Sequence, residues 1–105
     1  MMIATMIAAA MMLVQAGNAD RAAYRTCLSD AVTSAKAANV GVDAFKDYAH
    51  KTCAAIEQSF KAKLVSFNVK NGMSKKAAAE DADIQLEDYV YTAEERYRYS
   101  LEPPQ

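Results

Sequence analysis

The sequence predicts an all-α fold: a small three-helix arrangement built on a disulfide-linked antiparallel helical hairpin (Cys27–Cys53), with a long third helix. Three observations carry this prediction. Apolar residues recur at helical spacing through residues 20–101, and no stretch alternates with period two for long. The only prolines, Pro103 and Pro104, follow the last periodic residue. At this position they end the last helix, and no proline interrupts a helix. The only two cysteines lie at positions that face each other across a predicted turn.

A leader-like sequence precedes the first predicted helix. Residues 1–19 carry no charged side chain, and the apolar run from Ile3 to Val14 has the length of a signal-peptide core, too short to span a bilayer. Small residues then allow cleavage after Ala19, with Ala16 as the alternative. We therefore expect residues 1–19 to be a cleaved signal peptide and the protein to be periplasmic or secreted. Because no Lys or Arg precedes the apolar run, an uncleaved membrane anchor remains an alternative.

The rest of the chain divides into a single helical domain over residues 20–101 and a short proline-containing tail over residues 102–105. The net charge is −1, which argues against a nucleic acid or, after signal cleavage, a membrane as partner. The charge is unevenly spread: residues 20–71 hold eight basic and five acidic side chains, and residues 72–105 hold four basic and eight acidic ones. The two portions therefore carry opposite net charge.

Capping residues predict the helix boundaries. The first helix covers about residues 20–38, with Gly41 as a left-handed cap, and Asp43 is the expected N-cap of a second helix that runs to about Lys70. Gly72 ends that helix, and Ser74 is the N-cap of a third helix that reaches about residue 101. The residues expected to face inward on the second and third helices are Phe45, Ala49, Cys53, Ile56, Phe60, Leu64, Phe67, Ala82, Leu86, Tyr89, Val90, Ala93 and Tyr97.

The cysteine positions provide an independent test of the hairpin. In an antiparallel pair of helices, residues that face each other are centred on the turn, and Cys27 and Cys53 are centred on residue 40. This is where capping residues place the turn. In an oxidising compartment the pair is expected to form a structural disulfide. A redox role is disfavoured because redox dithiols are usually close in sequence, and a metal site because two cysteines and one histidine are an incomplete set.

No residue pattern predicts catalysis, a metal ion or a cofactor. His50 is the only histidine, and no catalytic or metal-binding motif such as HExxH surrounds it. We expect it to lie on the surface. The acidic pairs that follow Glu80 recur along the third helix, and we expect a solvated stripe, partly neutralised by Lys61, Lys63 or Lys70. A calcium loop is disfavoured because it requires a glycine at its bend.

Surface-binding residues are the strongest functional candidates. Tyr91 and Tyr99 point away from the apolar face of the third helix, and tyrosine offers apolar area with a hydroxyl. Near the end of the second helix, Leu64, Val65 and Phe67 extend beyond the end of the first helix and are expected to stay partly exposed, as interaction sites often are. We expect these five residues to contact a protein partner or a second copy of the chain.

The sequence therefore predicts an exported small helical protein that acts by protein or ligand binding, without catalytic activity. One alternative is a small exported hydrolase or metal-binding protein that uses the acidic face of the third helix. The other is a helical protein anchored to a membrane by an uncleaved N-terminal segment.

Overall fold

The computed structural model describes residues 2–102, with side chains described from residue 17 onward. In this range the chain forms four α-helices and no strand, and 88% of the chain is helical, which confirms the predicted all-α class. The elements are α1 (Met2–Ala37), the short 3-10 helix η1 (Val42–Ala44), α2 (Phe45–Thr52), α3 (Ala54–Lys70) and α4 (Lys75–Leu101).

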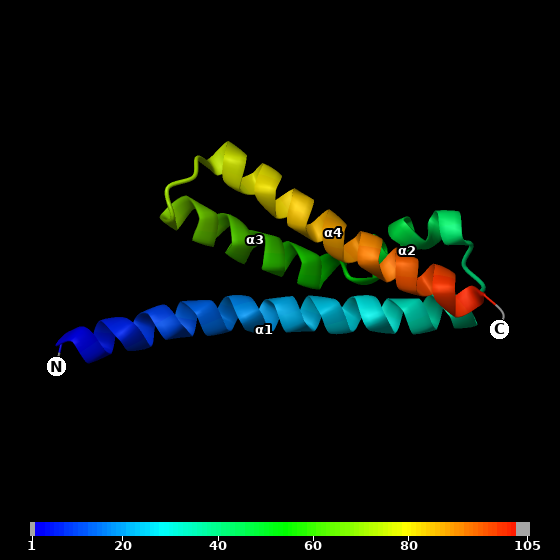
Figure 1. Ribbon diagram of the computed structural model, residues 1–105, viewed down its shortest axis with the longest axis horizontal. Coiled ribbons are helices and arrows are strands. Elements are labelled where there is room, and N and C mark those ends of the chain that lie inside the picture. Colours follow the sequence, from blue (N-terminus) through cyan, green and yellow to red (C-terminus); the bar gives the residue numbers. More distant parts are fainter. Residues whose placement is uncertain (1, 103–105) are drawn as a thin grey trace.

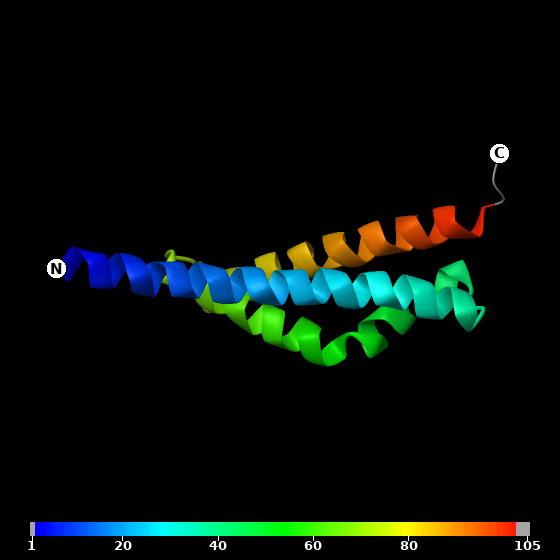
Figure 2. The same cartoon turned by 90° about the horizontal axis from the view of Figure 1, so that it is seen from below.

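The helices form an elongated bundle along α1 (Figures 1 and 2). The short helix α2 folds back beside the C-terminal part of α1, and α3 and α4 form a second hairpin that packs along α1. As a result α1 and α4 run in the same direction, with α3 antiparallel to both. The amino group of Lys36 near the end of α1 donates to the carbonyl of Ser100 near the end of α4 at 3.0 Å, so these two helix ends lie side by side.

Two left-handed residues end the helices that precede the turns. After α1 this residue is Asn39, with φ 56°, and the amide of Val40 donates to the Ala35 carbonyl at 3.0 Å. The expectation of a left-handed Gly41 is wrong, because Gly41 has φ −65°. Asparagine tolerates the left-handed conformation and so can end the helix two residues earlier.

The turn between α3 and α4 confirms the prediction. Gly72 has φ 99°, and the amide of Met73 donates to the Asn68 carbonyl at 3.0 Å, as in a Schellman motif. The hydroxyl of Ser74 then accepts a hydrogen bond from the amide of Ala77 at 3.1 Å, so Ser74 caps α4.

The predicted second helix is divided. Asp43 lies inside η1, and α2 begins at Phe45 without a side-chain cap, so Asp43 is not the N-cap. Cys53, with φ −106° and ψ 16°, separates α2 from α3. The helical hydrogen bonds from Cys53 to Ala49 and from Glu57 to Cys53 remain, at 2.9 and 2.8 Å. The chain therefore bends at Cys53 without unwinding.

All four α-helices contribute to the core, and α1 supplies Tyr24, Leu28, Ala31 and Ala35. Phe45 and Tyr97 stack with ring centroids 4.7 Å apart, and Phe60 packs against Tyr24 at 5.8 Å. This arrangement buries nearly every residue expected to face inward, with Ile56 and Tyr89 partly covered. Phe67 is the exception, since its side chain is 56% exposed.

The N-terminal prediction is left open by the fold. Helix α1 continues through the expected cleavage positions without a break. Most of the expected signal peptide, residues 1–16, lies outside the described side chains, and the end of the expected tail, residues 103–105, lies outside the described residues. Among the helices that the structure describes, none combines the length and apolarity needed to cross a membrane.

Candidate functional site

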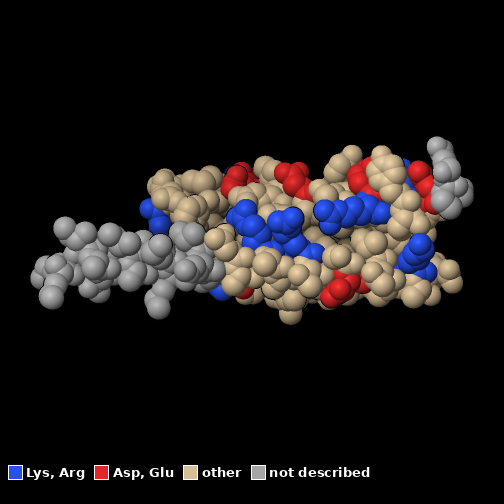
Figure 3. Space-filling view, turned by 60° about the horizontal axis from the view of Figure 1, so that its bottom comes forward, with Lys and Arg blue, Asp and Glu red and all other residues tan. Residues whose placement is uncertain are grey.

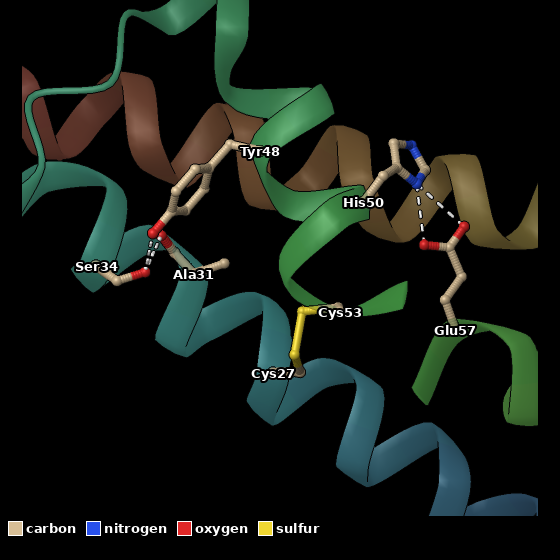
Figure 4. The surroundings of a disulfide bond; sticks show 7 residues. All are labelled: Cys27, Ala31, Ser34, Tyr48, His50, Cys53 and Glu57. Atoms are coloured by element: carbon tan, nitrogen blue, oxygen red, sulfur yellow. Dashed lines mark hydrogen bonds and ion pairs between the residues drawn. A yellow bond between two sulfur atoms is a disulfide. The ribbon is translucent and has the colours of Figure 1, made fainter. Parts of the chain in front are cut away.

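The predicted disulfide is present. Cys27 of α1 and Cys53 are bonded, with their Cα atoms 5.9 Å apart (Figure 4). Cys53 is buried and Cys27 is half-buried. Because Cys53 is also the bend between α2 and α3, the bond joins α1 to both of these helices at one point. The side chains are therefore part of the scaffold, and the predicted hairpin register is confirmed.

The bend at Cys53 brings His50 into a polar cluster. Its Nδ1 atom lies 2.9 Å from a carboxylate oxygen of Glu57 in α3, as Figure 4 shows, and its Nε2 atom lies 3.2 Å from Glu87 in α4. His50 is half-buried, so the expected surface position is only partly met, and its pairing with two carboxylates was not predicted. The side chain cross-links α2, α3 and α4.

The carboxylates control the protonation of this histidine. Burial is the largest single influence and lowers the pKa of His50, but the hydrogen bond and charge of Glu57, followed by those of Glu87, outweigh it and leave the pKa raised above 6.5. The protonated ring donates from both nitrogens, so neither is free to accept a proton from a substrate. Burial, followed by the charge of Glu57, raises the pKa of the Tyr24 phenol in α1.

We expect this cross-link to depend on pH. Because the pKa of His50 is higher in the folded chain, its stabilising effect is fully present below pH 6.5, its ordinary value, and is lost as pH rises through the folded-state pKa. His50→Gln should therefore lower the free energy of unfolding at pH 5.5 by up to about 1 kcal/mol, and by less at pH 9. Urea denaturation of both proteins at the two pH values measures this. A loss that is larger at pH 9 would contradict it.

Some carboxylates of the acidic stripe on α4 form ion pairs or hydrogen bonds with other helices. Asp83 pairs with Lys61 at 2.7 Å, as expected, but Lys63 pairs with Asp20 of α1 at 2.6 Å. The carboxylate of Asp81 accepts a hydrogen bond from the side-chain amide of Asn68 at 3.0 Å, which connects α4 to α3. Among the described residues no group of three or more histidine, cysteine or acidic side chains is arranged to hold a metal ion.

The five predicted contact residues do not form one surface. Leu64 is 7% exposed and Val65 is partly buried against the core, so the expectation of their exposure is wrong for Leu64 and only partly met by Val65. Phe67 is exposed near the turn between α3 and α4. Tyr91 and Tyr99 are exposed on the C-terminal half of α4, at 55% and 68%. The exposed residues thus occupy two separate regions.

A groove that the sequence did not predict lies between α1 and α4. Its volume is about 210 Å³. Helix α1 supplies four lining residues and α4 supplies five: Arg25, Leu28, Ser29, Val32, Asp88, Tyr89, Thr92, Ala93 and Arg96. Figure 3 shows basic side chains in a row across the middle of this elongated molecule, with acidic groups above and below.

Two arginines give the groove its charge. Neither Arg25 nor Arg96 forms an ion pair within the described side chains, and Asp88 is the only acidic residue of the lining. Leu28, Val32 and Ala93 supply an apolar wall, bordered by the ring of Tyr89. The groove therefore combines apolar area with two guanidinium groups and has a net positive charge.

The sequence contains only a weak signal for this groove. Arg25 and Ser29 are four residues apart, as are Asp88, Thr92 and Arg96, so each set lies along one edge of its helix. Such polar edges flank the apolar stripe of most amphipathic helices. Only the parallel packing of α1 and α4 shows that these two edges face each other.

The chain was compared with models of protein families, with curated proteins and with solved structures, and none of the three comparisons finds a match.

Proposed function

We propose that the protein is an exported helical domain that acts by binding, without catalysis, and that the groove between α1 and α4 is its binding site. The observation that carries this proposal is the groove itself, in which an apolar wall is bordered by charged and hydroxyl-bearing side chains. Ligand sites in proteins have this composition and occur between the helices of bundles.

The polar cluster at His50 supports a binding role over a catalytic one. Both of its ring nitrogens are engaged by carboxylates, at 2.9 and 3.2 Å. A general base needs a free nitrogen within hydrogen-bond reach of the substrate. The cluster fits a cross-link between helices, which holds α4 and its side of the groove in place.

Two features support export. A structural disulfide persists in an oxidising compartment such as the periplasm or the cell exterior. The charge-free first 19 residues, with small residues at their end, have the composition of a signal peptide. Mass determination of the protein purified from its native compartment tests this, since cleavage after Ala19 or Ala16 gives a defined shorter chain.

A pair of matched tryptophan substitutions tests the binding site. Ser29→Trp fills the groove from its edge, whereas Ser59→Trp places the same side chain on an exposed position of α3 outside the lining. Small aromatic probes that are anionic, neutral or cationic are added to each protein, and the melting temperature is followed. A ligand of the native state raises it. We expect at least one probe to stabilise the wild type and Ser59→Trp and to lose its effect on Ser29→Trp.

Two outcomes contradict the proposal. One is that no probe of any charge stabilises the wild-type protein. The other is that Ser29→Trp and Ser59→Trp respond to the probes in the same way, which would place binding outside the groove.

A further inference from the structure

We propose, as an inference that rests on the binding role of the groove, that its ligand is a small organic anion: a carboxylate or phosphate group joined to a flat apolar body. The groove has three parts that this chemistry matches. They are a pair of guanidinium groups, a hydroxyl donor, and an apolar wall beside an aromatic ring.

Arg25 and Arg96 line the same groove, and one anion there can lie within reach of both side chains. Because α1 and α4 run parallel (Figure 1) and residues 25–32 line the groove opposite residues 88–96, Arg25 lies toward the Tyr89 end of the lining. Arg96 lies two helical turns further along α4, about 10 Å along the axis. Each side chain spans more than half of this distance, and both line the same groove. A guanidinium group offers a planar pair of N–H donors that matches the oxygens of a carboxylate or phosphate.

The hydroxyl groups of the lining have different roles. Thr92 donates its hydroxyl proton to the Asp88 carbonyl at 3.0 Å and therefore offers no donor to a ligand. Ser29 makes no side-chain hydrogen bond among the described residues, so its hydroxyl is available to donate. The carboxylate of Asp88 repels an anion, and its single charge is outnumbered by the two arginines.

The volume limits the size of the ligand. About 210 Å³ is below the range of about 300–1,000 Å³ typical of sites for drug-sized molecules. We therefore expect a ligand with no more than a single ring, beside Tyr89 and the apolar wall formed by Leu28, Val32 and Ala93. Because both arginines are exposed to solvent, we expect modest affinity that falls as salt is added.

Small probes of different charge test the inference. Benzoate and phenyl phosphate are the anionic probes, benzyl alcohol is neutral, benzylamine is cationic, and inorganic phosphate lacks the apolar body. Binding to the isotopically labelled, disulfide-bonded protein is followed by NMR chemical shifts. We expect both aromatic anions to shift amide signals of residues 25–32 and 88–96. The anion that binds more tightly shows whether the groove prefers a carboxylate or a phosphate group. The alcohol, the amine and inorganic phosphate should bind at least about tenfold more weakly.

Charge-changing variants give the second readout. Arg25→Gln and Arg96→Gln should each weaken binding of the aromatic anions about five- to tenfold. Asp88→Asn, which removes the repelling charge from the groove, should strengthen it. Arg98→Gln is the matched control, because Arg98 pairs with Glu94 at 3.8 Å and lies outside the lining.

The outcomes separate the two proposals. If benzyl alcohol or benzylamine binds in the groove as tightly as benzoate, or if the arginine variants bind the anions unchanged, the anion inference is overturned while the binding role stands. If inorganic phosphate binds as tightly as phenyl phosphate, the part of the inference that assigns an apolar body to the ligand is overturned. If no probe shifts any groove signal, both the inference and the binding role of the groove fail.

Discussion

Removing the disulfide by the double substitution Cys27→Ser/Cys53→Ser is expected to lower the free energy of unfolding by about 3.5 kcal/mol. The bond closes a loop with a sequence separation of 26, and opening it restores the conformational freedom of this segment in the unfolded chain. For a domain of this size the loss corresponds to a fall in melting temperature of roughly 15–25 °C. Thermal and urea denaturation of the oxidised wild type and the double variant measure the effect.

Reduction of the wild type provides the control. A reducing agent should bring the wild-type melting temperature close to that of the double variant, and should leave the variant unchanged because it has no disulfide. A wild type that melts at the same temperature with and without reductant would show that the bond does not stabilise the hairpin.

Phe60→Ala is expected to lower the free energy of unfolding by about 3–5 kcal/mol, the range for deleting a buried aromatic ring. Phe60 is fully buried, with Tyr24 5.8 Å and Tyr89 6.0 Å from its ring centroid. The deletion leaves a cavity where α1, α3 and α4 meet. Urea denaturation measures the change, and Phe60→Leu, with a smaller loss, provides a variant that still folds if the alanine variant does not.

The same substitution elsewhere on α3 is the matched control. Phe67 is 56% exposed, so Phe67→Ala should change the free energy of unfolding by no more than about 0.5 kcal/mol. Equal losses at the two positions would contradict the burial pattern of α3. The comparison also tests the inward orientation that the sequence suggested for Phe67.

The difference between these two phenylalanines explains why the predicted inward orientation of Phe67 was wrong. The inward positions of the second predicted helix continue from Phe60 to Leu64 and then to Asn68, at steps of four residues. Hydrophobicity favours Phe67 as the next inward residue, but the helix places Asn68 there. The buried amide is satisfied by Asp81 at 3.0 Å. A pattern based on hydrophobicity alone cannot identify a polar residue that has its partner on another helix.

The cluster around His50 was missed for a related reason. In the sequence, His50 and Glu57 are seven residues apart on what reads as one continuous helix, about 10 Å along its axis. The bend at Cys53 brings the two side chains to 2.9 Å, and α4 adds Glu87. Local propensity does not predict such a bend, since no proline or glycine marks it.

By itself the sequence determined the helical class, the turn at Gly72, the cap at Ser74 and the Cys27–Cys53 pairing. These features depend on periodicity, local backbone preference and position along a hairpin, which are all readable from one chain. The tertiary structure alone decided that α1 and α4 lie parallel and side by side, and this contact creates the groove with Arg25 and Arg96. Packing between helices distant in sequence depends on the fit of whole side-chain surfaces, and no local pattern encodes it.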